Sequence, residues 1–140
     1  MTVRKGLWCA LVTATVLGAA ACAAVPREPV VLPTVGVTYA VPYDAVWDTT
    51  LKSLGAVKPV VADKAQGRIE SEQYTFYMGR GQILWVSLAI TVRRTDARHT
   101  TVEATTRVHD STLTGILPGP ISNPWVDLFA RIQSNLGLHG

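Results

Sequence analysis

The sequence predicts an α+β fold in which an antiparallel sheet of four to five strands carries two amphipathic helices on one face. Apolar and polar residues alternate over residues 83–94 and 100–110, which is typical of strands with one covered face. Apolar residues recur at helical spacing over residues 43–54 and 124–136, which indicates two helices with one buried stripe each. The resulting order is β-α-β-β-β-α, or β-α-β-β-β-β-α if residues 57–61 form a full strand.

The first 21 residues have the pattern of a secretory signal peptide. Arg4 and Lys5 precede an apolar run over residues 6–18, and small residues follow it. The run is shorter than the roughly 20 residues that a membrane-spanning helix needs. We therefore expect residues 1–21 to be removed on export. Ordinary signal-peptidase cleavage after Ala21 or Ala23 fits this segment.

Cys22 directly follows the small residues, and this arrangement resembles the lipobox of bacterial lipoproteins. The resemblance implies that Cys22 is lipidated and becomes the new N-terminus, with Ala19 standing where that family usually has leucine. Cys9 lies in the apolar run, so no intrachain disulfide can form in the mature chain. Two or three acyl chains anchor a protein stably. Ala23, in place of aspartate, implies by the same resemblance an outer-membrane anchor that faces the periplasm.

Residues 22–34 are expected to hold the lipidated cysteine and a proline-rich tether, and residues 35–140 a single domain. Once residues 1–21 are removed, 11 Lys and Arg residues face 10 Asp and Glu residues. This near balance excludes a basic nucleic-acid-binding domain, so we expect no nucleic-acid partner.

Boundary residues support the remaining elements of the first half of the domain. A short strand is expected over residues 36–41, and Pro42 and Gly55 suit the start and end of the helix that follows. Residues 68–76 read as one strand, which a loop rich in turn residues joins to the strand before it. The chain then turns at residues 96–99 between its two longest strands.

The C-terminal part combines an irregular loop with the second helix. Residues 111–122 contain Gly115, Pro118 and Gly119 and show no periodic pattern. Asn123 is a suitable N-cap for the helix that follows.

No catalytic or metal-binding pattern stands out in the sequence. His99, His109 and His139 have no companion at metal-ligand spacing, and structural roles are expected for them. The glycines around Arg80 lack the strand–loop–helix context of a phosphate loop. We therefore expect no cofactor, no metal and no enzymatic activity.

Four aromatic residues are candidates for a partner-binding surface. Trp85 shares the polar face of its strand, so its ring is expected to be exposed. Tyr74, Phe76 and Tyr77 crowd the end of a neighbouring strand. If these rings converge, they form an aromatic surface of the kind that binds proteins. Trp47, by contrast, lies on the apolar stripe of the first helix and is expected in the core.

The stretches YAVPYDAVWDTTLKSL (residues 39–54) and DKAQGRIES (residues 63–71) resemble the domains of BamC-like accessory lipoproteins of the outer-membrane β-barrel assembly machinery. The resemblance implies a helix-grip, TBP-like fold in which Trp47 anchors the first helix and Gly67 permits a tight turn. BamC-like proteins carry two such domains, whereas one is expected here. A single-domain envelope lipoprotein of similar fold is the inference that follows.

Two functions remain in view. The first is a membrane-anchored, non-catalytic binding or scaffold module for an envelope protein complex, attached through Cys22. The alternative is a carrier of a small apolar ligand or lipid, held in a cavity between the helices and the sheet. The number of bulky apolar residues on both faces of that interior favours a filled core over a cavity.

Overall fold

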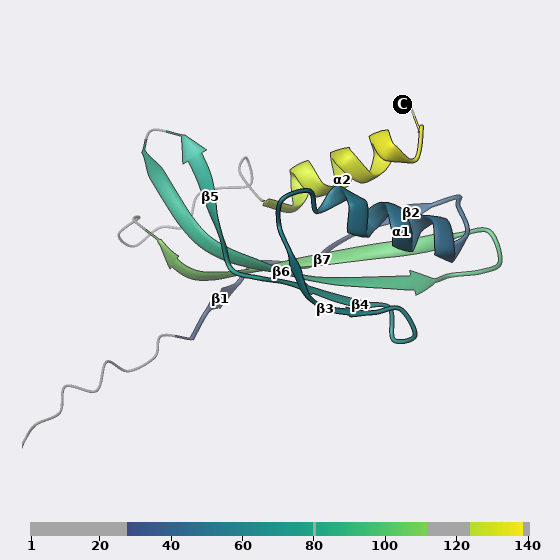
Figure 1. Cartoon of the computed structure of the whole chain (residues 1–140), viewed down its shortest axis with the longest axis horizontal. Coiled ribbons are helices and arrows are strands. Elements are labelled where there is room, and N and C mark those ends of the chain that lie inside the picture. The colour runs from purple at the N-terminus through teal and green to yellow at the C-terminus, as the bar shows by residue number, and fades with distance from the viewer. Residues whose placement is uncertain (1–27, 80, 112–123, 139–140) are drawn as a thin grey trace, which may run out of the picture.

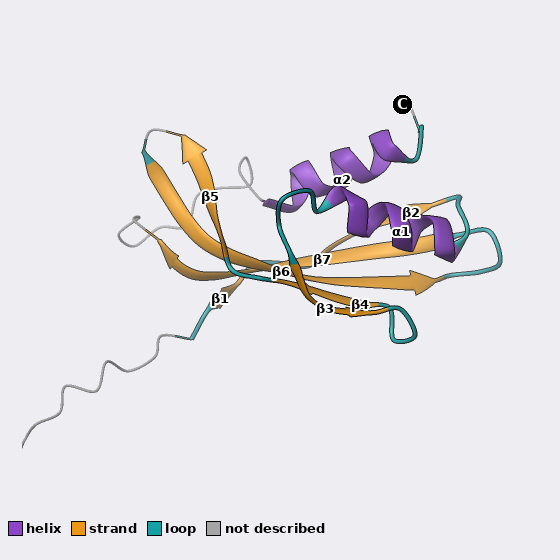
Figure 2. Ribbon diagram, in the orientation of Figure 1, coloured by secondary structure: helices purple, strands orange, loops and turns teal. Residues whose placement is uncertain are grey.

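Two helices lie on one face of an antiparallel sheet in the computed structural model (Figures 1 and 2). The structure describes residues 28–79, 81–111 and 124–138, so Cys22 and most of the predicted loop lie outside it. The elements are β1 (Val30–Val31), β2 (Val35–Tyr39), α1 (Tyr43–Ser53), β3 (Pro59–Asp63), β4 (Arg68–Ser71), β5 (Tyr74–Gly79), β6 (Gln82–Arg94), β7 (Thr100–Ser111) and α2 (Pro124–Asn135).

All strand pairs are antiparallel, and the order across the sheet is β1-β7-β6-β4-β3. β2 also pairs with β7, and β5 also pairs with β6. Each long central strand therefore has two short strands in succession along its outer edge. The α+β class, the antiparallel sheet and the two helices on one face are confirmed, and the sheet of the described residues has seven strands where four to five were predicted.

The long strand expected over residues 68–76 is divided into β4 and β5. At the break, the backbone N–H of Glu72 donates to the carbonyl oxygen of Lys58 and not to β6. The hydroxyl of Ser71 takes over on the β6 side by accepting the backbone N–H of Leu88 at 2.8 Å. This side-chain substitution for a ladder bond explains how the strand can leave β6 and rejoin it two residues later.

The sheet also begins earlier than the sequence indicates. Val30 and Val31, in the predicted tether, pair with Val108 and Arg107 of β7. The backbone N–H of Leu32 then donates to the carbonyl oxygen of Thr106 at 2.9 Å. Prolines on both sides of β1 are compatible with an edge strand, where one side needs no ladder partner.

Helix α1 matches its predicted span to within a residue. Its buried face includes Trp47 together with two polar residues, Thr50 and Ser53. The hydroxyl of Thr50 donates to the carbonyl oxygen of Val46 at 2.7 Å, and that of Ser53 donates one turn back in the same way. These internal bonds let the hydroxyl groups lie in an apolar interior without losing a partner.

Gly67 fixes the β3–β4 turn against β6. Its φ is +65°, and a Cβ at this position would lie 2.1 Å from the carbonyl oxygen of Val92. The backbone N–H of Val92 donates to the carbonyl oxygen of Gly67 at 2.7 Å. Both the positive φ and the lack of room for a Cβ therefore require glycine at this turn, as the sequence predicts.

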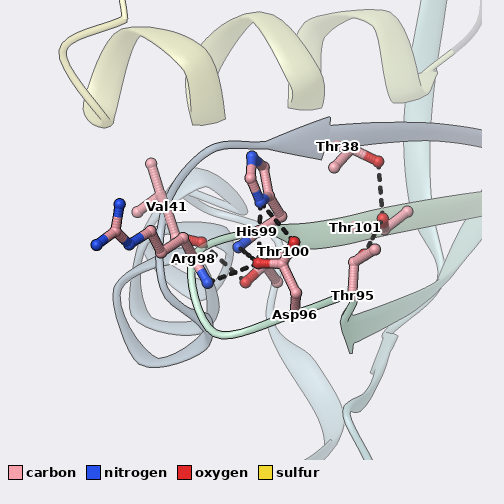
Figure 3. Close-up of polar contacts among 8 residues, drawn as sticks. All are labelled: Thr38, Val41, Thr95, Asp96, Arg98, His99, Thr100 and Thr101. Carbon is pink, nitrogen blue, oxygen red and sulfur yellow. Dashed lines mark hydrogen bonds and ion pairs between the residues drawn. The ribbon is translucent and has the colours of Figure 1, made fainter.

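The hairpin between β6 and β7 is closed by a polar network around Asp96 (Figure 3). One carboxylate oxygen of Asp96 accepts the backbone N–H groups of Arg98 and His99 at 2.7 and 2.8 Å. These bonds, with the His99 ring 2.8 Å away, lower the pKa of Asp96. Within this turn, His99 has the structural role expected for it.

Candidate functional site

The interior between helices and sheet consists of two apolar clusters. The larger one lies under both helices and includes Trp47, Ile90 and Leu128. The smaller one consists of Leu84, Val86 and Val108, with Leu32, Tyr74 and Phe76 packed against it. Tyr74 packs against both clusters, so the interior is continuous through its ring.

Thr106 lies on β7 where the two clusters meet. Its neighbours on the same face are Ala104, in the larger cluster, and Val108, in the smaller one. The side chain is 0% exposed, and its hydroxyl has no hydrogen-bond partner in the part of the chain that the structure describes. A hydroxyl buried in this way costs on the order of 1–3 kcal/mol.

Trp125, in the first turn of α2, carries a second buried polar group. Its ring packs against the larger cluster and meets Phe129 edge-on, with ring centroids 6.1 Å apart. The indole Nε1 is buried, and no acceptor for it is found among the described residues. An indole N–H only donates, so a partner for it must supply an acceptor.

The hydroxyl of Tyr74 adds a third polar group from β5. Burial raises the pKa of Tyr74 to about 12, while Arg131 of α2 lowers it and Asp127 of α2 raises it. The ring of Tyr74 packs against both clusters, so it lies where the two clusters meet. We call Tyr74, Thr106 and Trp125 the boundary site: three polar groups from β5, β7 and α2 in an interior that is otherwise largely apolar.

The structure does not bring the four predicted partner-binding aromatics together. Tyr74 and Phe76 lie opposite Val86 and Leu84 and point to the interior face. Trp85 lies opposite Thr75 on the outer face, with 40% of its surface exposed. Tyr77 points to the same outer face and is 72% exposed. The two-residue period of β5 explains the separation, because Tyr74 and Tyr77 are an odd number of residues apart.

One pair on the outer face was not found from the sequence. The Oγ of Ser87 lies 2.8 Å from Nε2 of His109. The β6–β7 register shifts between Trp85 and Val86, which leaves His109 as an extra residue beside Ser87. The pair places a hydroxyl and an imidazole within hydrogen-bond distance on the outer face. Sequence spacing alone gives no sign of such a bulge.

A polar cleft of about 510 Å³ lies where the start of α1 meets the β3–β4 turn and the end of β6. Lys64 there is 2.9 Å from the carboxylate of Asp44, and this contact raises the pKa of Lys64. The guanidinium of Arg94 lies 5.5 Å from the centre of the Tyr43 ring. Beside this cleft, the ion pair links the β3–β4 turn to α1, and the cation–π contact links the end of β6 to α1.

Metal and membrane features are limited in the described residues. No group of three or more metal-ligating side chains occurs in residues 28–79, 81–111 and 124–138. Neither α1 nor α2 has the length and apolar character that crossing a bilayer requires.

The sequence matches no protein-family model and no curated protein. Among solved structures, norcoclaurine synthase from Thalictrum flavum is 12% identical and aligns over 80% of this chain and 90% of its own, with a TM-score of 0.46. Ara h 8.0201 is 12% identical over 78% of this chain and 99% of its own, with a TM-score of 0.42. A START superfamily protein from Mycobacterium smegmatis is 10% identical over 79% and 92%, with a TM-score of 0.32.

These likenesses are remote, and the fold assignment rests on the topology of this chain itself. None of these comparisons supports the resemblance to BamC-like lipoproteins, which rests on the sequence motifs alone.

Proposed function

We propose that this protein is a membrane-anchored, non-catalytic lipoprotein of the bacterial envelope that carries a small ligand in the boundary site. The observation that carries the proposal is the pair of buried polar groups without partners, the Thr106 hydroxyl and the Trp125 indole N–H. Most buried polar groups in folded proteins are hydrogen-bonded, so each exception needs an explanation.

A ligand can supply what these groups lack. The indole N–H of Trp125 requires an acceptor, and the hydroxyl of Thr106 can donate or accept. Their surroundings on β6 and β7 are apolar. The matching ligand therefore has a largely apolar body with at least one oxygen acceptor, as a lipid or fatty acid has. Ligand sites commonly combine an apolar lining with a few placed polar groups.

The anchor is proposed from the sequence around Cys22. A short apolar leader followed by small residues and a cysteine supports export and lipidation. Cys22→Ser should leave the protein unacylated and release it from the membrane fraction. Acylation and membrane association that persist in Cys22→Ser would contradict this part of the proposal.

Solvent extraction of the purified full-length protein tests the carrier function. Extracts of the wild type should contain a small apolar molecule in a fixed ratio to protein, and Thr106→Val should lower that ratio. Thr91→Val is the matched control, because Thr91 lies on the outer face of β6. An equal ratio in wild type and Thr106→Val, or no molecule in either, contradicts the proposal.

A scaffold for an envelope protein complex is the second candidate. The exposure of Trp85 and Tyr77 on one outer face favours it, because exposed aromatics suit binding surfaces. In this case, protein subunits should co-purify with the wild type and be lost from Trp85→Ala.

A further inference from the structure

We propose that one end of the outer sheet face rests on the lipid bilayer to which the protein is anchored. The residues concerned are Val31, Tyr77 and Trp85, which we call the anchor-end surface. The inference depends on the proposed lipid anchor at Cys22, and it adds an orientation of the domain that the anchor alone does not impose.

The sheet register places these residues at a common end. Val31 lies opposite Arg107 of β7, which in turn lies opposite Ser87 of β6. Trp85 is two residues further along β6, towards the end where β1 begins. By standard strand spacings, the Cα atoms of Val31 and Trp85 are roughly 12 Å apart. Figure 1 shows β1 at the same end of the sheet as β5 and the start of β6.

The length of chain before β1 limits how far this end can lie from the bilayer. Seven residues lie between Cys22 and Val30, and the eight Cα-to-Cα steps span at most about 29 Å when fully extended. The chain enters the sheet at the edge of β7 through Val30. A lipid on Cys22 therefore keeps the anchor-end surface near the headgroups, whereas the other end of the sheet can lie further away.

The chemistry of the outer face changes along its length in the same direction. At the end distant from β1, Arg93 pairs with Glu103, and the hydroxyls of Thr38 and Thr101 are 2.7 Å apart. At the β1 end, the exposed side chains of the outer face include Trp85, Tyr77 and Val31, and Asp110 lies opposite Trp85 in the register. Val60, Val126 and Leu138, which are also exposed, lie on β3, on α2 and after α2.

A bilayer interface is the partner that this composition fits. Tryptophan and tyrosine are enriched at the level of lipid headgroups, because their rings have an apolar body and a polar edge. Arg107, next to Val31 in the register, has 41% of its side chain exposed and can approach a lipid phosphate. The nearest carboxylate oxygen of Glu70 is 3.9 Å from Arg107, a long contact that leaves the guanidinium available.

Tryptophan quenching in vesicles tests this orientation. The full-length acylated protein is reconstituted in vesicles of phosphatidylethanolamine and phosphatidylglycerol, with and without bromine on the acyl chains. The emission of Trp85 is the difference between wild type and Trp85→Phe, which cancels the other tryptophans. Bromine should quench most of this difference. A double variant, Val31→Ser with Tyr77→Ser, should reduce the quenching, and Val60→Ser should leave it unchanged.

Flotation of the same vesicles separates the possible failures. Protein that floats with the vesicles but keeps its Trp85 emission overturns the membrane orientation while the anchor stands. Trp85 shielded by a co-purified protein subunit, and not by lipid, overturns it in favour of a protein partner. Protein that does not float refutes the anchor itself, and the inference with it. Equal melting temperatures for wild type and Trp85→Phe show that the variant is folded.

Discussion

Replacing Thr106 by valine removes a buried hydroxyl while keeping a β-branched side chain of nearly the same shape. In the ligand-free protein, the hydroxyl has no partner among the described residues, so its removal relieves a cost of about 1–3 kcal/mol. The added methyl group contributes up to about 0.8 kcal/mol through apolar burial. We therefore expect Thr106→Val to raise the free energy of unfolding of the solvent-extracted protein by about 1–3 kcal/mol.

The ligand should reduce the stabilising effect of this substitution. With ligand bound, the wild-type hydroxyl has a partner, and losing that hydrogen bond costs about 0.5–1.5 kcal/mol of binding free energy. The ligand should thus stabilise the wild type more than Thr106→Val.

Urea unfolding of extracted and loaded protein measures both effects. A gain of 1 kcal/mol corresponds to roughly 4 °C or more in Tm for a domain of this size. Thr91→Val, on the outer face of β6, should change stability by no more than about 0.5 kcal/mol. A clear loss of stability in extracted Thr106→Val would contradict this prediction, because it would mean that the hydroxyl already has a partner within the protein.

Three further predictions concern the sheet and its turns. Trp85→Ala should change the Tm little, whereas Phe129→Ala, in the core, should cost about 3–5 kcal/mol in thermal or urea unfolding; comparable losses would place Trp85 in the core. Gly67→Ala should destabilise by more than about 1 kcal/mol, since its Cβ would meet the Val92 carbonyl oxygen and its φ is positive; an unchanged urea midpoint would contradict this close approach. Asp96 has a folded pKa below 3.8, so it should stabilise the protein above that pH and lose this effect as the pH falls through its folded value. Asp96→Asn should lack that part of the acid dependence of the unfolding free energy, and identical acid profiles would count against the turn network.

The sequence was sufficient to predict the main fold because its periodicities are strong. Alternation along β6 and β7 identified the interior face correctly, with Ile90 and Val102 buried and Arg93 exposed. The helical stripes likewise identified Trp47 and Leu128 as core residues. Local patterns of this kind survive in the folded protein because one face of each element is covered.

Other features depend on contacts between distant segments. The break between β4 and β5 arises because Ser71 bonds to Leu88, which no local pattern shows. Pairing of Val30 with Val108 joins residues far apart in the chain. Strict alternation along residues 74–77 would have placed Tyr74 and Tyr77 on opposite faces, and that signal was present in the sequence.

The boundary site could be predicted only in part. Thr106 lies at an inward position of the alternation along residues 100–110, but a pattern of inward positions does not show whether a hydroxyl has a partner. The same holds for Trp125, whose stripe position indicates burial of the ring and gives no information about its indole N–H. Hydrogen-bond satisfaction is a property of the assembled interior and must be taken from the structure.

Native mass spectrometry of the full-length protein, gently extracted from its own membrane, tests the proposed function most directly. We predict an acylated chain that retains the additional mass of one small molecule, with a reduced fraction of that species in Thr106→Val. An acylated chain without additional mass, or one that carries protein subunits alone, would contradict the proposed carrier function.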